Sequence, residues 1–166
     1  MNEIIKQNNI KLSDEEKKIS DDEINHIIDI LNDEKHHYLE NKKPSQIRDE
    51  IRRILQINNI IPSEKVRETL ASNYRYVDDL TELQRGKSVF VYSFKSGKIF
   101  YAGIVCCIDA MDRGVLITCK TYGDKILKYY FNDAITFQYL NDSEKIILST
   151  NDFLIGGRGR GASRGK

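Results

Sequence analysis

The spacing of apolar residues changes at Gly86 and divides the chain into a helical part and a strand-rich part. Before Gly86 the apolar residues recur every three or four positions, which is the period of an amphipathic helix. After Gly86 they alternate or cluster, and β-branched and aromatic residues dominate, as in β-strands. The sequence therefore predicts an α+β protein, in which a small N-terminal helical module is followed by a β-domain.

The helical part contains three predicted helices, at about 20–40, at 44–59, and from Ser63 to a closing turn at 77–83. The first begins with the capping-box sequence SDDE, the second begins at Pro44, and Ser63 is the expected N-cap of the third. Each helix carries an apolar stripe that we expect to be buried. The predicted buried faces are Ile24, Ile27, Ile28 and Leu31; Ile47, Ile51, Ile54 and Leu55; and Val66, Leu70 and Tyr74.

Five short strands are predicted in the second part of the chain, separated by tight turns. Closing them into a small barrel removes the exposed edges of a sheet, so we expect a five-stranded, SH3-like β-barrel. A further apolar stretch at 145–155 is expected to pack on the barrel as a strand or a helix. The predicted strands lie at about 88–94, 98–108, 114–121, 125–130 and 134–139.

The two ends of the chain are polar. Residues 1–19 are weakly patterned, and residues 156–166 are a low-complexity Arg-Gly segment that we expect to be disordered when alone. The predicted organisation is therefore a flexible acidic arm at 1–19, a helical module at 20–83, a barrel with its extension at 84–155, and an Arg-Gly tail at 156–166.

Charge is distributed unevenly along the chain, although the net charge is only +1. Residues 1–41 hold 11 acidic and 5 basic residues, whereas residues 42–87 hold 10 basic and 7 acidic ones. The last 14 residues hold four basic residues and no acidic one. An acidic arm with basic segments after it favours nucleic acid as a partner.

Several functional classes find no support in the sequence. No apolar run is long enough for a transmembrane helix, and the N-terminus lacks a signal-peptide pattern, so we expect no membrane partner. The three cysteines lie in strand-like sequence and are interpreted as reduced residues of an intracellular protein. We find no phosphate-binding glycine loop and no zinc pattern, and adjacent His36 and His37 point in different directions on a helix. We therefore expect no cofactor and no enzymatic activity.

The segment from Gly86 to Gly97, GKSVFVYSFKSG, is followed by KIFYAGIV and later by VLITCKTYGD, which ends at Asp124. Over about 84–140 this pattern resembles a Tudor domain, most specifically in its Tyr-Gly-Asp turn. The resemblance implies a Tudor-like barrel that recognises methylated arginine or lysine in an aromatic cage, because aromatic faces attract a methylated cation.

The resemblance places the barrel ligand pocket at four residues: Phe94, Phe100, Tyr122 and Asp124. Phe100 and Tyr122 match aromatic cage positions, and Asp124 stands where the family has an Asn. The first-strand aromatic position holds Ser93, with Phe94 beside it, and a further cage position holds Cys119. Alternatively, Phe100 and Tyr122 are ordinary core residues, since half of the residues in barrel strands point inward.

An Sm-like barrel is the alternative for the same segment. The run from Gly103 to Asp109, GIVCCID, fits the Gly-x-Leu-x-x-x-Asp pattern of that family. The residues after Asp109 are one short of the expected spacing, and the later Arg-Gly of that family is absent. The Tudor-like interpretation is therefore preferred.

The run SQIRDEIRRILQINN, followed by PSEKVRETL and Tyr74, resembles the C-terminal domain of the DEK chromatin protein over about 42–82. That resemblance implies a small helical fold that binds DNA or chromatin. A helix pair of this kind presents basic side chains to phosphates, although acidic residues are interleaved with them here, so a protein-docking surface is the alternative. The candidate contacts are Arg52, Arg53, Lys65 and Arg67.

The tail adds three more candidate contacts, Arg158, Arg160 and Arg164, each followed by a glycine. Arginine offers a charged planar fork for phosphates and for base stacking. We therefore expect a non-catalytic nuclear or chromatin-associated adaptor that binds DNA or RNA, with a barrel that docks a methylated or unmethylated protein tail or nucleic acid. Alternatives are a reader of methylated arginine or lysine and a self-associating assembly subunit of a ribonucleoprotein or of a virion.

Overall fold

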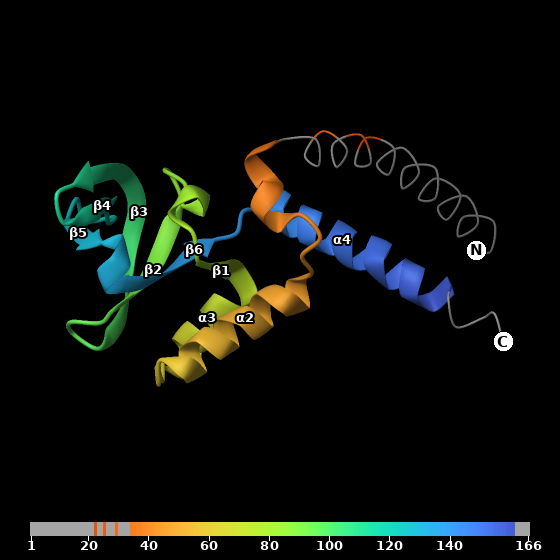
Figure 1. Ribbon diagram of the computed structural model, residues 1–166, viewed down its shortest axis with the longest axis horizontal. Helices are drawn as coiled ribbons and strands as arrows, with labels where there is room; N and C mark the ends of the chain where they lie inside the picture. Colours follow the sequence, from red (N-terminus) through yellow and green to blue (C-terminus); the bar gives the residue numbers. More distant parts are fainter. Residues whose placement is uncertain (1–21, 23–24, 26–28, 30–33, 162–166) are drawn as a thin grey trace, which may run out of the picture. The chain divides into compact units, whose positions relative to one another are not determined.

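The computed structural model describes residues 22, 25, 29 and 34–161, which belong to two compact units. The larger unit, Lys42–Asp142, contains two α-helices and a six-stranded antiparallel sheet (Figure 1). The smaller unit combines Met1–Asn41 with Ser143–Lys166. The predicted α+β class is confirmed. None of the helices in the described part of the chain is long and apolar enough to cross a membrane.

Helix α2, Pro44–Ile57, begins and ends where the sequence places it. Pro44 supplies the fixed φ that suits a first helical position, and the Gln46 side chain accepts a hydrogen bond of 2.8 Å from the Lys43 backbone. At the other end the Asn58 side chain donates to the Ile54 carbonyl, at 2.9 Å. All four residues of the predicted apolar face are buried: Ile47, Ile51, Ile54 and Leu55.

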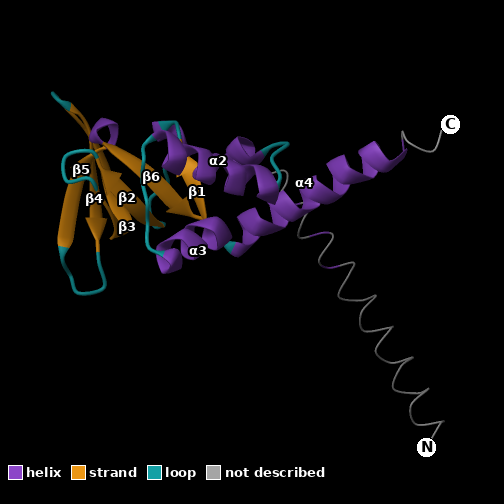
Figure 2. Cartoon of the chain, turned by 90° about the horizontal axis from the view of Figure 1, so that it is seen from below, coloured by secondary structure: helices purple, strands orange, loops and turns teal. Residues whose placement is uncertain are grey.

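Helix α3, Glu64–Asn73, starts at the predicted N-cap, where Ser63 Oγ accepts a hydrogen bond from the Val66 backbone at 3.3 Å. The helix stops before Tyr74, which the sequence assigned to its apolar stripe. Instead, Tyr74–Val77 forms strand β1, a sixth strand that the sequence did not predict. Helices α2 and α3 pack against each other and against β1 (Figures 1 and 2).

The remaining strands match the predicted positions within a few residues. They are β2 (Ser88–Ser93), β3 (Lys98–Met111), β4 (Gly114–Lys120), β5 (Ile126–Tyr130) and β6 (Ala134–Tyr139). The strand order is β1-β6-β2-β3-β4-β5, so β1 and β5 are the two edges of an open sheet. The prediction of a closed five-stranded barrel is corrected accordingly: β1 extends the sheet beside β6, and its other side faces no further strand.

Strand β3 is long because it serves two partners, β2 with its first half and β4 with its second. A bulge between Val105 and Cys107 and a left-handed Gly103 (φ +101°) mark the change of partner. Side chains of one sheet face form an apolar core. Its fully buried members include Val89, Val91, Ala102, Val105, Ile117 and Cys119.

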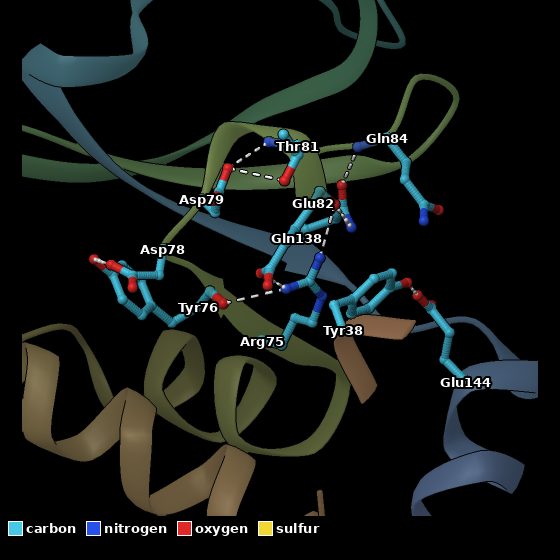
Figure 3. A network of polar contacts seen from close by, with 10 residues as sticks. All are labelled: Tyr38, Arg75, Tyr76, Asp78, Asp79, Thr81, Glu82, Gln84, Gln138 and Glu144. Carbon is cyan, nitrogen blue, oxygen red and sulfur yellow. Dashed lines mark hydrogen bonds and ion pairs between the residues drawn. The ribbon is translucent and has the colours of Figure 1, made fainter. Parts of the chain in front are cut away.

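A buried polar network ties β1 to the segment that leads into β2 (Figure 3). Arg75 on β1 is only 2% exposed, and its guanidinium donates to the Glu82 carboxylate and to the Glu82 carbonyl, each at 2.8 Å. Gln138 on β6 is fully buried, and its side-chain oxygen accepts from the Gln84 backbone at 2.6 Å. Short 3₁₀ segments, η2 (Leu80–Glu82) and η3 (Phe131–Asp133), complete the connections.

The smaller unit is described by a 3₁₀ segment, η1 (Glu34–Leu39), and by helix α4 (Asp142–Gly161). The Tyr38 hydroxyl donates to the Glu144 carboxylate, and the Asn151 amide donates to the Leu39 carbonyl at 2.9 Å. The predicted helix at 20–40 lies largely outside the described residues, although Asp22, Asn25 and Asp29 are helical.

Helix α4 extends beyond the stretch in which the sequence predicted a strand or a helix. It begins at Asp142, before the predicted start at residue 145, and its backbone continues to Gly161. The boundary predicted at residue 156 falls within this helix, and residues 162–166 lie outside the described residues. A helix is extended more easily than it is nucleated, which offsets part of the cost of glycine in these last turns.

Candidate nucleic-acid interface

A groove of about 590 Å³ lies in the larger unit between α2, the loop that follows it, and α3. Its floor is apolar, because some residues of α2 and of the following loop that belong to the buried core also line the groove. The floor residues Ile51, Leu55, Ile60 and Pro62 are all buried. The loop contributes Ile61, whose side chain is 91% exposed at the edge of the groove.

Three arginines from the two helices also line the groove. Arg48 and Arg52 are four residues apart on α2, so they lie one turn apart on the same face, and Arg67 comes from α3. None of the described residues that line the groove is acidic. Within the described part of the chain Arg48 and Arg67 have no ion-pair partner, and Arg52 pairs with the exposed Asp49 at 3.3 Å. Exposed pairs of this kind contribute about 0–1 kcal/mol, so the positive charge of the groove is available to a ligand.

The structure brings together two of the four contacts predicted for the helical module. Arg52 and Arg67 line the groove, whereas Arg53 and Lys65 do not. A step of one residue turns a helix by about 100°, and Arg53 lies near Tyr76 instead, where its charge opposes the rise in the pKa of that tyrosine caused chiefly by burial. Lys65 is exposed elsewhere on α3.

The tail arginines belong to the smaller unit. Arg158 and Arg160 lie in the last turns of α4, and Arg164 lies outside the described residues. Nothing in the structure therefore describes how their side chains are placed.

The residues predicted to form the barrel pocket do not converge on one point. Phe100 packs against the apolar core of the sheet, next to Val91 on β2. Phe94 follows the end of β2, is 52% exposed, and contacts Tyr92 edge-on with ring centroids 5.8 Å apart. Tyr122 follows β4, whose last residue lies level with the opposite end of β2. The structure thus places Phe94 and Tyr122 at opposite ends of that strand.

Tyr122 lies near a different group of aromatic residues. It is 91% exposed, and it lies close enough to Tyr101 that its ionised form raises the pKa of Tyr101, a pKa already raised by burial. Tyr101 contacts Phe90 edge-on at 5.5 Å, and Phe90 contacts Tyr74 at 5.1 Å. We call Tyr74, Phe90, Tyr101 and Tyr122 the aromatic cluster.

Asp124 is held by its own turn. Its carboxylate pairs with Lys120 at 3.0 Å, and its backbone adopts a left-handed conformation with φ of 58°. Both features are those of a turn residue, since Asp tolerates this conformation better than most residues. The role that the resemblance implies for Asp124 in a guanidinium site stays a prediction.

Two residues of these sites were missed by sequence reasoning. Arg48 lies one helical turn before Arg52, and this four-residue spacing was the available signal. Tyr101 lies one residue after Phe100, and the pairing of Phe90 with Tyr101 places it on the face opposite the core. The alternation of strand side chains was visible in the sequence, but its phase depends on the register with β2.

No group of three or more His, Cys, Asp or Glu residues in the described part of the chain is arranged to hold a metal ion. Cys106 and Cys107 are exposed, and Cys119 is buried in the core. Comparisons of the chain with family models, with curated proteins and with solved structures found no match.

Proposed function

We propose that this protein is a non-catalytic nucleic-acid-binding adaptor that acts on chromatin or on a ribonucleoprotein. The observation that carries this proposal is the convergence of Arg48, Arg52 and Arg67 from two helices on one groove, where no acidic side chain of the described residues lies in the lining. The Arg-Gly tail would add further contacts that do not depend on sequence.

Arginine suits this role for physical reasons. The guanidinium keeps its charge at every physiological pH and presents a rigid fork of donors that matches phosphate geometry. Contacts of this type position a nucleic acid without reading its sequence. Because each contact releases condensed counterions, the affinity should fall steeply as the salt concentration rises.

Two finer assignments belong to the same proposal. We propose that α2 and α3 correspond to the DEK-like helical module, which is supported by the confirmed ends of α2 and by the N-cap of α3. We propose further that β2–β6 is a Tudor-like domain that docks a protein tail. Support comes from the consecutive pairing of β2, β3, β4 and β5 and from the return of β6 to the side of β2.

Binding of the full chain to labelled duplex DNA and to single-stranded RNA across a salt series tests the proposal. The variant Arg52→Ala/Arg67→Ala should bind more weakly, and its log–log salt slope should be shallower by about 1.8 for duplex and about 1.4 for single strands. The matched control is Arg53→Ala/Lys65→Ala, which removes the same charge from the same two helices but outside the groove.

The control should bind within about twofold of the unmodified protein, since surface substitutions away from a site change free energies little. Equal losses in the two variants would show that net charge, and not the groove, determines binding. Absence of binding by the unmodified protein at low salt would refute the proposed function.

A second candidate function is recognition of a methylated arginine or lysine by the aromatic cluster. It is favoured by the exposure of Tyr122 beside Tyr101, since aromatic faces attract a methylated cation. The variants Tyr101→Ala and Tyr122→Ala should each abolish binding of a methylated peptide, measured against the unmethylated peptide, whereas Tyr130→Ala should not. Retention of methyl-specific binding in both variants would exclude this candidate.

A further inference from the structure

We infer that the groove between α2 and α3 receives an unpaired nucleotide of a single strand, with its base on the apolar floor and its phosphates on the arginines. This inference rests on the proposed function and adds the form of nucleic acid that the site prefers. It makes the groove a site for single-stranded RNA or DNA rather than for a duplex.

The apolar floor is the first reason. Phosphate binding alone requires only cationic side chains on a surface, yet the arginines here share the groove with the apolar side chains of exposed Ile61 and half-buried Ala71, above the buried Ile51 and Leu55. A duplex keeps its bases stacked inside, so its phosphates would reach the arginines while the floor remained uncovered. An unpaired base has two apolar faces, and its transfer onto this floor removes apolar surface from water.

The size and the polar groups of the groove are the second reason. Its volume of about 590 Å³ lies within the range of about 300–1,000 Å³ that is usual for small-ligand sites. Gln56 and Asn59 line it with side-chain amides, which both donate and accept hydrogen bonds and therefore suit the edge of a base. The planar guanidiniums at its border are able to stack on a base as well as to bind a phosphate.

An acidic amphipathic peptide is the competing occupant, since it would also complement an apolar floor with a cationic border. A nucleic-acid strand carries one negative charge at every nucleotide, so it satisfies the arginines wherever it lies along the groove. A peptide must instead place carboxylates at matching positions. The three arginines, with no acidic side chain beside them in the lining that the structure describes, therefore favour the strand.

Ala71 on α3 provides a direct test, because it lines the groove and a larger side chain there would fill it. The probes are a labelled oligothymidine strand and a labelled duplex of the same length, measured with the full chain. We expect Ala71→Leu to weaken strand binding by at least about tenfold, because the larger side chain excludes the base from the groove, and to leave duplex binding within about twofold. Ser72→Leu, its exposed neighbour that does not line the groove, should change neither.

Two exposed isoleucines give a second, independent comparison that does not disturb the core. Ile61 is at the edge of the groove and Ile57 is outside it, with exposed fractions of 91% and 62%. Ile61→Ala should weaken binding of the strand but not of the duplex, and Ile57→Ala should weaken neither. Circular dichroism of each variant establishes that it is folded before its affinity is compared.

The outcomes separate this inference from the function on which it rests. If strand and duplex bind equally well, and Ala71→Leu and Ile61→Ala affect both or neither, the inference is refuted while nucleic-acid binding stands. If no nucleic acid binds, both are refuted. The competing occupant is tested with a labelled acidic amphipathic peptide of glutamate and leucine. If this peptide binds in the groove and the strand does not displace it, the occupant is a peptide and the inference is refuted.

Discussion

Arg75 is the residue on which the polar interior of the larger unit depends. Its guanidinium is nearly inaccessible to water, and the carboxylate of Glu82 pairs with it at 2.8 Å. Removal of one partner of a buried pair leaves an uncompensated charge in a medium of low polarity. We expect Glu82→Gln to lower the free energy of unfolding by about 3 kcal/mol in urea denaturation.

The exposed pair of Asp49 with Arg52 is the control for this prediction. Asp49→Asn also removes the carboxylate from an ion pair with an arginine. In this pair, however, the side chains of Asp49 and Arg52 are both about 70% exposed. Its effect should stay within about 0.5 kcal/mol, because water already screens the interaction. Equal effects of the two substitutions would show that burial of Arg75 does not matter to stability.

Cys119 should make the free energy of unfolding depend on pH in the alkaline range. Burial, together with nearby Cys106, raises the pKa of the Cys119 thiol from 9.0 to about 12. In the unfolded chain the thiol ionises at its ordinary pKa, so this contribution to stability is complete below pH 9 and is lost as pH rises toward 12. The free energy of unfolding should fall with a slope of up to about 1.4 kcal/mol per pH unit from this group.

Urea denaturation at several alkaline pH values, with a reductant present, measures that slope. The variant Cys119→Ala should be less stable at neutral pH because it leaves a cavity, but its stability should fall less steeply above pH 9. The tyrosines with raised pKa values, Tyr74 and Tyr129 among them, titrate in both proteins, because burial is the main cause of each rise and Cys119 adds only the last of the contributions at Tyr129. An unchanged slope would mean that Cys119 does not titrate between the two states in this way.

Among the elements, those with strong local signals were predicted well. Pro44 and Asn58 fix the ends of α2, and alternating residues between turn sequences fix most strands within a few residues. Strand β1 was missed because Tyr74 continues the helical spacing of Val66 and Leu70, and because only pairing with β6 makes its four residues a strand. Pairing between segments so distant in sequence leaves no local pattern.

The candidate sites were predicted less well for the same reason. Of the four basic residues chosen in the helical module, the two that line the groove cannot be told from the others by residue type. In the sheet, Phe100 and Tyr101 are adjacent aromatic residues, and the sequence alone did not show which of the two lies in a binding site. The register with β2 places Phe100 toward the core and Tyr101 opposite Phe90, and a shift of one residue would exchange them.

Gly103 lies in strand β3 at a position where a side chain would collide with strand β4. A Cβ atom at this position would lie 2.4 Å from the Lys120 carbonyl oxygen, and the φ of +101° is a conformation that side chains rarely adopt. Gly103→Ala should therefore force β3 away from β4 and lower the free energy of unfolding by at least about 2 kcal/mol. Gly123→Ala should change it by less than about 0.5 kcal/mol, because no atom lies within 4 Å of the added group. Similar values for both in thermal or urea denaturation would contradict the close approach of the two strands.

At the scale of the whole molecule, the basic residues that we propose as nucleic-acid contacts belong to two units. The groove lies in Lys42–Asp142, and the Arg-Gly sequence continues the C-terminal helix of the other unit. Linked contacts on one strand raise affinity without any new chemistry, because the second contact forms at the high effective concentration set by the first. The proposed function therefore assigns part of the salt dependence to each unit.

Substitution of Arg158, Arg160 and Arg164 by alanine measures the share of the tail without shortening α4. If all three contact a single-stranded RNA, the log–log salt slope should become shallower by about 2, since each phosphate contact contributes about 0.7. Lysine at the same positions is the matched control: it keeps the charge and hence the slope, but it loses the planar fork and should still bind somewhat more weakly. The alanine changes and Arg52→Ala/Arg67→Ala should have additive effects on the logarithm of the affinity, because the altered side chains belong to different units. A slope that the alanine changes leave untouched would assign nucleic-acid binding to the groove alone.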